Sequence, residues 1–326
     1  MVYVYGLSDV YYDSYYLNGI KELFGSYTFN TSKFPKLNQN VFAVIIEQKG
    51  VDFKFIIDSR DANTFIEFEL EWCNVYGKVN YNIETIPEKF KSKILPIGPS
   101  FAIKNWNLLQ TFYFFCTNYY KFYDQIADKN NYKANFFRQY KRMSINEYRP
   151  SKTKENYIFF LSSIWKSEPI TNQKRAIFID VCKSFKTIFF EGGFAPRADG
   201  NNLGFNNLTI SKRYSLKQYL ANTKHSVLVF NTPAVQSCHG WKLAEFLALG
   251  KAIISTTHLN ELPEKLNHNE HLLYNDCDEN LKSTIQSLLD DNELKLKLEK
   301  NARQYFERNL APKVIIEKLI SNFLII

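Results

Sequence analysis

The second half of the chain alternates short apolar runs with stretches of helical periodicity, and this alternation constrains the fold more than any other feature. Runs typical of buried strands cover residues 157–161, 187–190, 227–230 and 252–255. Helical stretches separate them, at residues 172–182, 216–220 and about 240–249, and a helical tail begins near residue 280. Strands that alternate with helices predict a mostly parallel, doubly wound α/β sheet.

The first half shows the same rhythm less clearly. Strand-like runs cover residues 2–6, 41–46, 53–57 and 94–97, and polar loops follow them. The loop after the first run contains Asp9 and Asp13, the loop after the third contains Asp58 and Asp61, and residues 98–100 follow the fourth. Because ligands of open α/β sheets bind outside the carboxyl ends of the strands, we expect these loops to face a cleft.

Residues 106–142 combine aromatic and basic side chains at helical spacing. We predict helices here, with the aromatic stripe packed in the core. The polar stretch 148–156, which contains Pro150, is the predicted domain boundary. A chain of 326 residues exceeds what one core usually supports, about 250–300 residues. The predicted fold class is therefore α/β, with two Rossmann-like domains at residues 1–150 and 151–326, parallel sheets and a cleft between them.

Charge and cysteine usage exclude several classes of protein. The net charge is +8, yet no block of Lys and Arg and no nucleic-acid-binding motif occurs, so no nucleic-acid partner is expected. The five cysteines are scattered and form no CxxC pair, which argues against a disulfide framework or a zinc site and fits a reducing cytoplasm. The sequence shows neither a signal-peptide pattern nor an apolar stretch of about 18–20 residues, so no membrane span is expected.

Residues 237–256 carry the most informative pattern, which is a loop, a helix, a glycine stop at Gly250 and a strand. The first N–H groups of a helix lack intrahelical partners and carry the positive end of its dipole, so a pyrophosphate can bind there. Gly240 allows close approach of the backbone, and Lys242 adds a positive charge in the first turn. Glu245 lies on the same helix face as Lys242 and is suited to bind a ribose or sugar hydroxyl.

This segment resembles the donor-site signature of GT-B glycosyltransferases, especially the group 1 and exostosin-like types. The residues that fit the signature are Lys242, Glu245, Ala248, Gly250, Ile253 and Ile254, followed by Glu261, Leu262 and Pro263. The resemblance extends over residues 157–306. The first half is similar only in its rhythm of strands and helices.

The resemblance implies transfer of a sugar from a nucleoside diphosphate sugar to a glycan or lipid-linked acceptor, with no obligatory metal and no other cofactor. It implies that Glu245 holds the ribose, and that Lys242 and the helix start hold the diphosphate. The commonest role of the family is synthesis of bacterial surface polysaccharide in the cytoplasm. The retaining pattern has a second Glu eight residues before the first, where this chain has Ser237. The donor sugar and the stereochemical outcome therefore stay open.

Further donor-site candidates are Lys166 after the first strand of the second half, Arg197 and Arg213 in loops, and His239 before the helix. Each is weighed against an ordinary role at the surface or in the loop. All five histidines lie in the second half. A general base in the first half is therefore a carboxylate, with Asp9 and Asp13 the leading catalytic candidates and Asp58 and Asp61 next. Loop Asp residues also serve as caps and turn formers.

Two other functions use the same pattern, namely a GT-B sugar-nucleotide epimerase and a catalytically silent nucleotide-binding scaffold subunit. The histidine-free first half argues against the epimerase, whereas Ser237 at the position of the second Glu allows the scaffold. Residues 314–326 are amphipathic to apolar, with Lys313 and Lys318 nearby. They predict either peripheral contact with the inner face of the cell membrane or a helix that packs back onto the fold.

Overall fold

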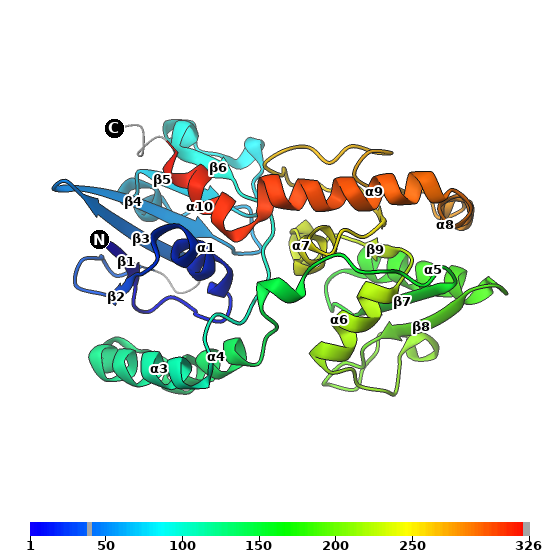
Figure 1. Ribbon diagram of the computed structural model, residues 1–326, viewed down its shortest axis with the longest axis horizontal. Helices are drawn as coiled ribbons and strands as arrows, with labels where there is room; N and C mark the ends of the chain where they lie inside the picture. Colours follow the sequence, from blue (N-terminus) through cyan, green and yellow to red (C-terminus); the bar gives the residue numbers. More distant parts are fainter. Residues whose placement is uncertain (38–40, 322–326) are drawn as a thin grey trace. The chain divides into compact units, whose positions relative to one another are not determined.

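The structure is a computed structural model that describes residues 1–37 and 41–321. The chain forms two compact units (Figure 1). Unit 1 contains Met1–Glu147, Asn260–Glu264 and the segment that begins at Arg308, and unit 2 contains Tyr148–Leu259 and Lys265–Glu307. The second unit thus begins at Tyr148, close to the position where the sequence predicts a boundary.

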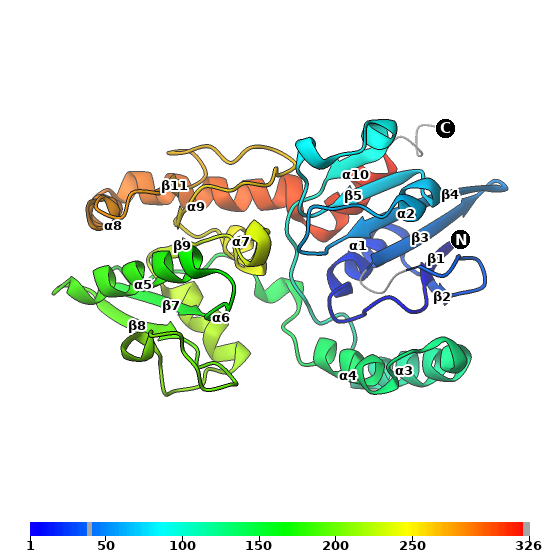
Figure 2. The ribbon, with the colours of Figure 1, turned by 180° about the vertical axis from the view of Figure 1, so that it is seen from behind.

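Unit 1 is built on a mixed sheet of strand order β2-β1-β3-β4-β5-β6. Helices α1 and α10 cover one face of this sheet and α2 covers the other (Figures 1 and 2). The elements are β1 (Val2–Tyr5), α1 (Ser14–Phe24), β2 (Thr28–Asn30), β3 (Val41–Gln48), β4 (Val51–Asp58), α2 (Glu67–Trp72), β5 (Val75–Lys78), β6 (Ile94–Pro96), α3 (Leu108–Phe122), α4 (Lys129–Tyr140) and α10 (Pro312–Ile320).

One strand of unit 1 departs from the expected parallel arrangement. β3 is antiparallel to both of its neighbours, β1 and β4, whereas β1–β2, β4–β5 and β5–β6 are parallel pairs. The reason is local. Lys49 and Gly50 both have positive φ and close a two-residue hairpin between β3 and β4. Such a turn leaves no room for a crossover, so the two strands must run in opposite directions.

The end of the chain packs against its beginning. Ile315 and Ile316 of α10 are fully buried, and α10 lies along α1. Gly19 makes this approach possible, because a Cβ there would lie 2.2 Å from the carbonyl oxygen of Pro312. Two segments expected in the second domain, Asn260–Glu264 and the chain from Arg308 onward, thus belong to unit 1. Of the two predictions for residues 314–326, packing back onto the fold is confirmed for α10, whose Ile315, Ile316, Leu319 and Ile320 are buried, and membrane contact of this segment has no support. Residues 322–326 lie outside the described residues.

Helices α3 and α4 confirm the helices predicted within residues 106–142, but the prediction that their aromatic stripe is core is only half right. An inner set of rings packs together, with Trp106 stacked on Phe136 at 5.7 Å between centroids. Along α3, however, only Thr111, Asn118 and Phe122 are buried. The rest of its aromatic side chains are half-buried or exposed.

Unit 2 consists of parallel strands with helices between them. Its elements are β7 (Tyr157–Ser162), α5 (Pro169–Ser184), β8 (Phe189–Phe194), α6 (Leu216–His225), β9 (Val229–Asn231), α7 (Trp241–Ala248), β10 (Ile253–Ser255), β11 (Leu273–Tyr274), α8 (Leu281–Asp290) and α9 (Asn292–Tyr305). β7 pairs with β8, and β10 pairs with both β9 and β11, all in parallel.

The two sets of strands in unit 2 meet where β7 lies beside β9. The N–H of Val227, just before β9, donates to the carbonyl of Tyr157 at 2.8 Å. The strand order is therefore β8-β7-β9-β10-β11, which in chain order is 2-1-3-4-5. Phe160, Phe178 and Phe230 pack at the centre, and the rings of the last two are stacked with centroids 4.5 Å apart. This is the strand order of flavodoxin-like sheets, which bind ligands at the switch point between strands 1 and 3.

The end of α7 agrees with the sequence prediction, whereas the bounds of β8 differ from it. Gly250 has φ +57° and ends α7, as predicted from its position. The strand predicted at residues 187–190 is shifted, since β8 spans Phe189–Phe194 and includes Gly192 and Gly193. The predicted fold class, α/β with two Rossmann-like units, is confirmed apart from the reversed β3.

Candidate functional site

The carboxyl ends of β7 and β9 form the switch point of the unit 2 sheet, and polar residues gather there. Ser162 and Ser163 end β7, and Asn231 and Thr232 end β9. In sheets of this order, the helices that follow the two strands leave opposite sides of the switch point, which opens a crevice between the loops. The side chains at these two strand ends therefore mark the first place to look for a bound ligand.

Arg175 of α5 bridges the two strand ends and is only 5% exposed. Its Nε donates to the hydroxyl of Thr232 at 2.8 Å, and its Nη1 donates to the carbonyl of Ser163 at 3.0 Å. These acceptors are neutral. Burial lowers the pKa of Arg175 to about 10, and the negative charge of Glu168 opposes this shift. An arginine so placed stays protonated and presents a positive charge at the switch point.

Lys242, in the first turn of α7, adds a second cation at the same place. Its Nζ donates to the carbonyl of Leu161 near the end of β7 and lies 5.2 Å from the centre of the Phe160 ring. Burial, and then the positive charge of Arg175, lowers the pKa of Lys242, and the charge of Glu245 opposes both, so that the pKa is about 7. The positive charges of Arg175 and Lys242 are therefore close enough to repel each other.

The amino end of α7 has no capping side chain. Gly240 is the N-cap residue, has extended backbone angles and supplies no side-chain hydrogen bond to the helix. The first N–H groups of α7 consequently have no capping side chain, and they carry the positive end of the helix dipole. Together with Lys242 and Arg175, this helix start provides the donors and charge that bind a phosphate.

Glu245 lies one turn further along α7 and is buried, with 4% of its surface exposed. The hydroxyl of Tyr219, from α6, donates to its Oε2 at 3.1 Å. Burial, and then the negative charge of Glu245, raises the pKa of Tyr219, so the phenol keeps its proton and remains a donor. The bond from Tyr219 thus holds the carboxylate of Glu245 in place.

His239 precedes α7 and is also buried, at 6% exposure. Its ring centroid lies 5.4 Å from that of His258. His258 is enclosed by Asn231 and Ser255 at Nε2 and by Tyr274 at Nδ1, at distances of 3.1 to 3.3 Å. Burial, and then the charge of His239, lowers the pKa of His258 to about 3, so this second imidazole is neutral.

The remaining donor-site candidates lie on other loops of unit 2. Arg197, after β8, pairs with the carboxylate of Asp199 at 2.6 Å and donates to the carbonyl of Ile164. Lys166 is exposed after β7. The hydrogen bond from Arg197 is the main cause that lowers the pKa of Asp199, and the charge of Lys166 contributes. Arg213 is exposed in the segment before α6. The structure thus groups His239, Gly240, Lys242 and Glu245 around one helix start, while Arg197 is already neutralised by its neighbour.

Sequence reasoning missed Arg175 and Tyr219. Both lie inside helices, where periodicity predicts packing and gives no sign of chemistry. Only the folded arrangement brings Arg175 from α5 to the switch point. A signal was nevertheless available, because Arg175 is a charged residue within an otherwise apolar helix face, next to Ala176 and Phe178. Charged residues are rarely buried without a specific partner or ligand.

Asp9, the leading catalytic candidate of unit 1, follows β1 and lines a hollow of about 60 Å³. Its Oδ1 accepts from the N–H of Tyr11 at 2.9 Å, and its Oδ2 accepts from the amide of Asn135 at 2.7 Å. Burial raises the pKa of Asp9, against the backbone hydrogen bonds and the charge of Arg138. Ser8 and Asn131 also line the hollow, so its wall is polar.

Asp13 is enclosed, with 1% of its surface exposed, and it does not line that hollow. It is the N-cap residue of α1 but makes no side-chain capping bond, and its Oδ2 has no hydrogen-bond partner among the described residues. Burial, and then the negative charge of Asp9, raises the pKa of Asp13 well above its usual range. Of the two carboxylates, only Asp9 is therefore placed to touch a ligand.

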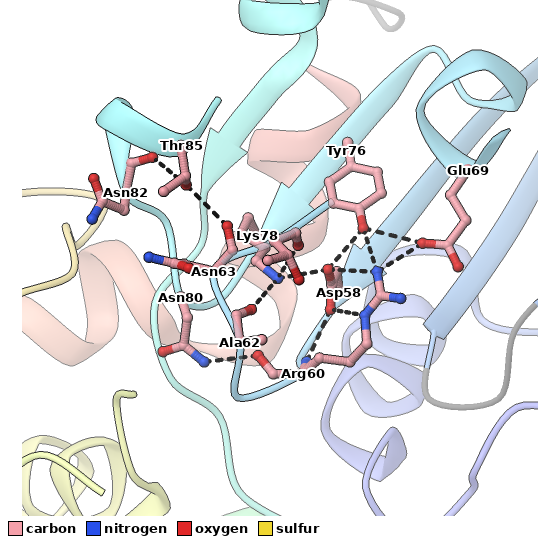
Figure 3. Close-up of polar contacts among 11 residues, drawn as sticks. Asp58, Arg60, Ala62, Asn63, Glu69, Tyr76, Lys78, Asn80, Asn82 and Thr85 are labelled. Carbon is pink, nitrogen blue, oxygen red and sulfur yellow. Dashed lines mark hydrogen bonds and ion pairs between the residues drawn. The ribbon is translucent and has the colours of Figure 1, made fainter. Parts of the chain in front are cut away.

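Asp58 belongs to a buried ionic network at the ends of β4 and β5 (Figure 3). Lys78, which is completely buried, donates to its Oδ2 at 2.7 Å, and Arg60 contacts both carboxylate oxygens and Glu69. Tyr76 donates to Asp58 at 2.8 Å. The hydrogen bonds of Arg60 and Lys78 lower the pKa of Asp58 despite its burial. Such a carboxylate is a poor base, because two cations pair with it and hold its pKa below the usual value.

The same network shapes the loop after β4. Lys78 also donates to the carbonyls of Ala62 and Thr64, and Asn80 donates to the carbonyl of Arg60 (Figure 3). These bonds fix the loop that contains Asp61, whose side chain is exposed. We therefore interpret the network as structural, because its charges and its loop carbonyls satisfy one another.

The part of the chain that the structure describes holds no group of three or more His, Cys, Asp and Glu side chains placed to bind a metal ion. Within the same residues, no helix combines the length and the hydropathy that crossing a bilayer requires.

Comparisons with known proteins give similar solved structures but no family or curated match. No protein-family profile and no curated protein matches the chain. The C-terminal domain of a glycosyl transferase group 1 family protein (LpcC) from Francisella tularensis is 14% identical, with TM-score 0.35, over 50% of this chain and 95% of that domain. A glycosyltransferase from Rickettsia africae is 13% identical, with TM-score 0.46, over 80% of this chain and 67% of its own.

A third similar structure is MnaA of S. aureus with UDP, at 12% identity and TM-score 0.38, over 80% of this chain and 64% of that chain. These likenesses concern the fold alone.

The network around Asp58 predicts the cost of removing its buried cation. Lys78→Met should lower the free energy of unfolding by about 3 kcal/mol, because a buried carboxylate loses its partner and two loop carbonyls lose their donor. Lys91→Met, at an exposed lysine, should change it by less than about 0.5 kcal/mol. Urea unfolding of the wild type and both variants measures this. Equal stability of the two variants would contradict a structural role for Lys78.

Proposed function

We propose that this protein is a glycosyltransferase that moves a sugar from a nucleoside diphosphate sugar to a glycan or lipid-linked acceptor. The observation that carries the proposal is the meeting of Arg175, Lys242 and the uncapped start of α7 at the switch point of unit 2. Helix N-terminus and cations together supply what a diphosphate needs. The GT-B resemblance of the same helix supports this assignment.

The proposed roles follow from position and charge. Lys242, Arg175 and the N–H groups after Gly240 hold the diphosphate. Glu245, fixed by Tyr219, accepts hydrogen bonds from the ribose hydroxyls, for which a carboxylate is suited and a phosphate is not. His239 lies beside this helix start and contacts the donor. Lys166, Arg197 and Arg213 remain weaker candidates for the same site.

Catalysis in this proposal uses no metal and no other cofactor. As the sugar leaves, negative charge develops on the diphosphate, and the two cations and the helix dipole stabilise it. Asp9 acts as the general base that takes the proton of the acceptor hydroxyl, and its raised pKa brings it closer to the working range of a base. Asp13, which is enclosed, has no part in this step. We further infer a cytoplasmic role in surface polysaccharide synthesis, which rests on the family resemblance alone.

A thermal-shift panel of UDP, GDP, CDP and ADP tests the donor site. One nucleotide should stabilise the wild type, by about 2.7 kcal/mol at a concentration near 100 Kd, because it binds only the folded state. Glu245→Gln, which keeps the shape of the side chain but loses its charge, should lose most of this stabilisation. Lys217→Gln, at an exposed lysine of α6, is the matched control and should respond like the wild type. If no nucleotide raises the Tm of the folded wild type, the transferase proposal fails. The alternative of a catalytically silent scaffold subunit is then favoured.

The pKa of Lys242 predicts how nucleotide affinity depends on pH. In the free protein the pKa is about 7. A bound diphosphate favours the charged ammonium and so raises this pKa in the complex. Binding therefore takes up a proton, and affinity should fall as pH rises above 7, by up to about tenfold per pH unit until the pKa of the complex is reached.

Isothermal titration between pH 6 and 9 measures this dependence. Lys242→Met should bind more weakly at pH 6 and show a flatter profile. Lys217→Met should keep the wild-type profile. Titration of the nucleotide's own phosphate contributes equally to all three proteins, so the difference in slope isolates Lys242. The same slope in Lys242→Met and wild type would rule out Lys242 as the titrating group.

The role of Asp9 can be tested without knowledge of the acceptor, by hydrolysis of the donor in its absence. Asp9→Asn should lower turnover by about 100-fold or more, because the base is lost, while the nucleotide-induced thermal shift is unchanged. Asp52→Asn, at an exposed carboxylate of β4, should hydrolyse the donor at the wild-type rate. Wild-type turnover by Asp9→Asn would remove Asp9 from the mechanism.

A further inference from the structure

Helix α3 of unit 1 presents an apolar face to solvent. Leu109 is 80% exposed, Tyr113 64% and Tyr120 89%, and these values are high for large apolar side chains. Scattered exposed apolar residues are ordinary in folded proteins, but a contiguous set marks an interaction surface. The full set, which we call the outer face of α3, consists of Leu108, Leu109, Phe112, Tyr113, Cys116, Tyr120 and Tyr123.

These residues recur at the spacing of one helix face. Positions 109, 112–113, 116, 120 and 123 follow one another at intervals of three and four, so they form one stripe along the helix. The opposite face carries Thr111, Asn118 and Phe122, which are buried against unit 1. The exposed stripe is thus additional to the face that packs the helix onto its own unit. Folding does not require the outer face, since it contacts solvent.

The segment that carries the outer face has a net positive charge. Helix α3 contains no Asp or Glu. Residues 108–142, which span α3 and α4, contain six Lys and Arg and two Asp, so their net charge is +4. The Nζ of Lys129, at the start of α4, lies 4.4 Å from the centre of the Tyr123 ring at the end of the outer face. Lys133, one turn further along α4, is exposed.

We propose that the outer face of α3 binds the surface of an anionic lipid bilayer. Tyrosine is the residue type that favours the membrane interface, where its ring meets acyl chains and its hydroxyl meets headgroups. Leu and Phe between the tyrosines supply the part that enters the acyl boundary, and lysines beside them attract anionic headgroups. A helix of 15 residues is shorter than the roughly 20 that span a bilayer, so α3 lies in the interface plane.

Charge favours lipid over a second copy of the chain as the occupant. Two copies that meet through this face would bring two sets of excess positive charge together, which costs free energy. An anionic bilayer neutralises the same charges. The proposal is independent of the donor site in unit 2, and its test needs no nucleotide or acceptor.

Co-sedimentation with lipid vesicles tests the proposal. The wild type should bind vesicles that contain about one third phosphatidylglycerol and should bind phosphatidylcholine vesicles much more weakly, with loss of binding at high salt. The double variant Leu109→Ser/Tyr120→Ser should bind anionic vesicles at least about tenfold more weakly. Lys129→Gln/Lys133→Gln should weaken binding by about fivefold for each charge removed.

The control variant is Phe189→Ser/Leu296→Ser, which removes two comparably exposed apolar side chains of unit 2. It should bind like the wild type, and all variants should keep the wild-type Tm. Absence of wild-type binding would overturn the proposal, as would an equal loss in the control variant. So would sedimentation velocity that shows a wild-type dimer dispersed by Leu109→Ser/Tyr120→Ser, because a second copy would then cover the outer face.

Discussion

The bridge that Arg175 makes between β7 and β9 is the interaction on which the candidate site depends. These two strands lie side by side without a full ladder of backbone bonds, because the hydroxyl of Ser226 takes the N–H of Phe159 at 2.9 Å. Beyond this point the strand ends diverge toward Ser163 and Thr232, and Arg175 contacts both. A guanidinium holds the switch point together through neutral oxygens. Its charge is therefore still available to an anion.

The two units handle buried charge in opposite ways. In unit 1, Asp58 and Glu69 balance Arg60 and Lys78 within hydrogen-bond distance, so the network is closed. Such a network fixes a loop and resists titration, because each charge stabilises its partner. In unit 2, Arg175 and Lys242 donate to carbonyls and a hydroxyl. Burial lowers the pKa of both side chains. A closed network indicates structure, whereas cations held by neutral groups at a strand end indicate a binding site.

Much of this organisation could be predicted from the sequence, and the exceptions have physical causes. The helix from Trp241 and its stop at Gly250 follow from local signals, since capping and left-handed backbone depend on neighbouring residues. The reversed direction of β3 follows from the two-residue turn at Lys49 and Gly50. The spacing of the apolar runs does not show the direction of a strand. Arg175 could not be assigned a role in advance, because its partners lie 12 and 57 residues away along the chain. The periodicity of a helix predicts which face a side chain lies on. It does not predict which strand ends that side chain will contact.

The aromatic residues of α3 show how one helix can serve two environments. Phe114, Phe115 and Phe122 face inward or lie half-buried, and Phe114 packs against Trp106 with centroids 4.8 Å apart. Tyr113 and Tyr120, in contrast, lie on the outer face. Phenylalanine has no polar group to satisfy and is best buried, whereas a tyrosine hydroxyl must reach water or a headgroup. The separation of rings by polarity is partial, since Phe112 lies on the outer face and Tyr119 is half-buried. Tyr113 and Tyr120 nonetheless place two large amphipathic rings in solvent, which fits a face that meets an amphipathic surface.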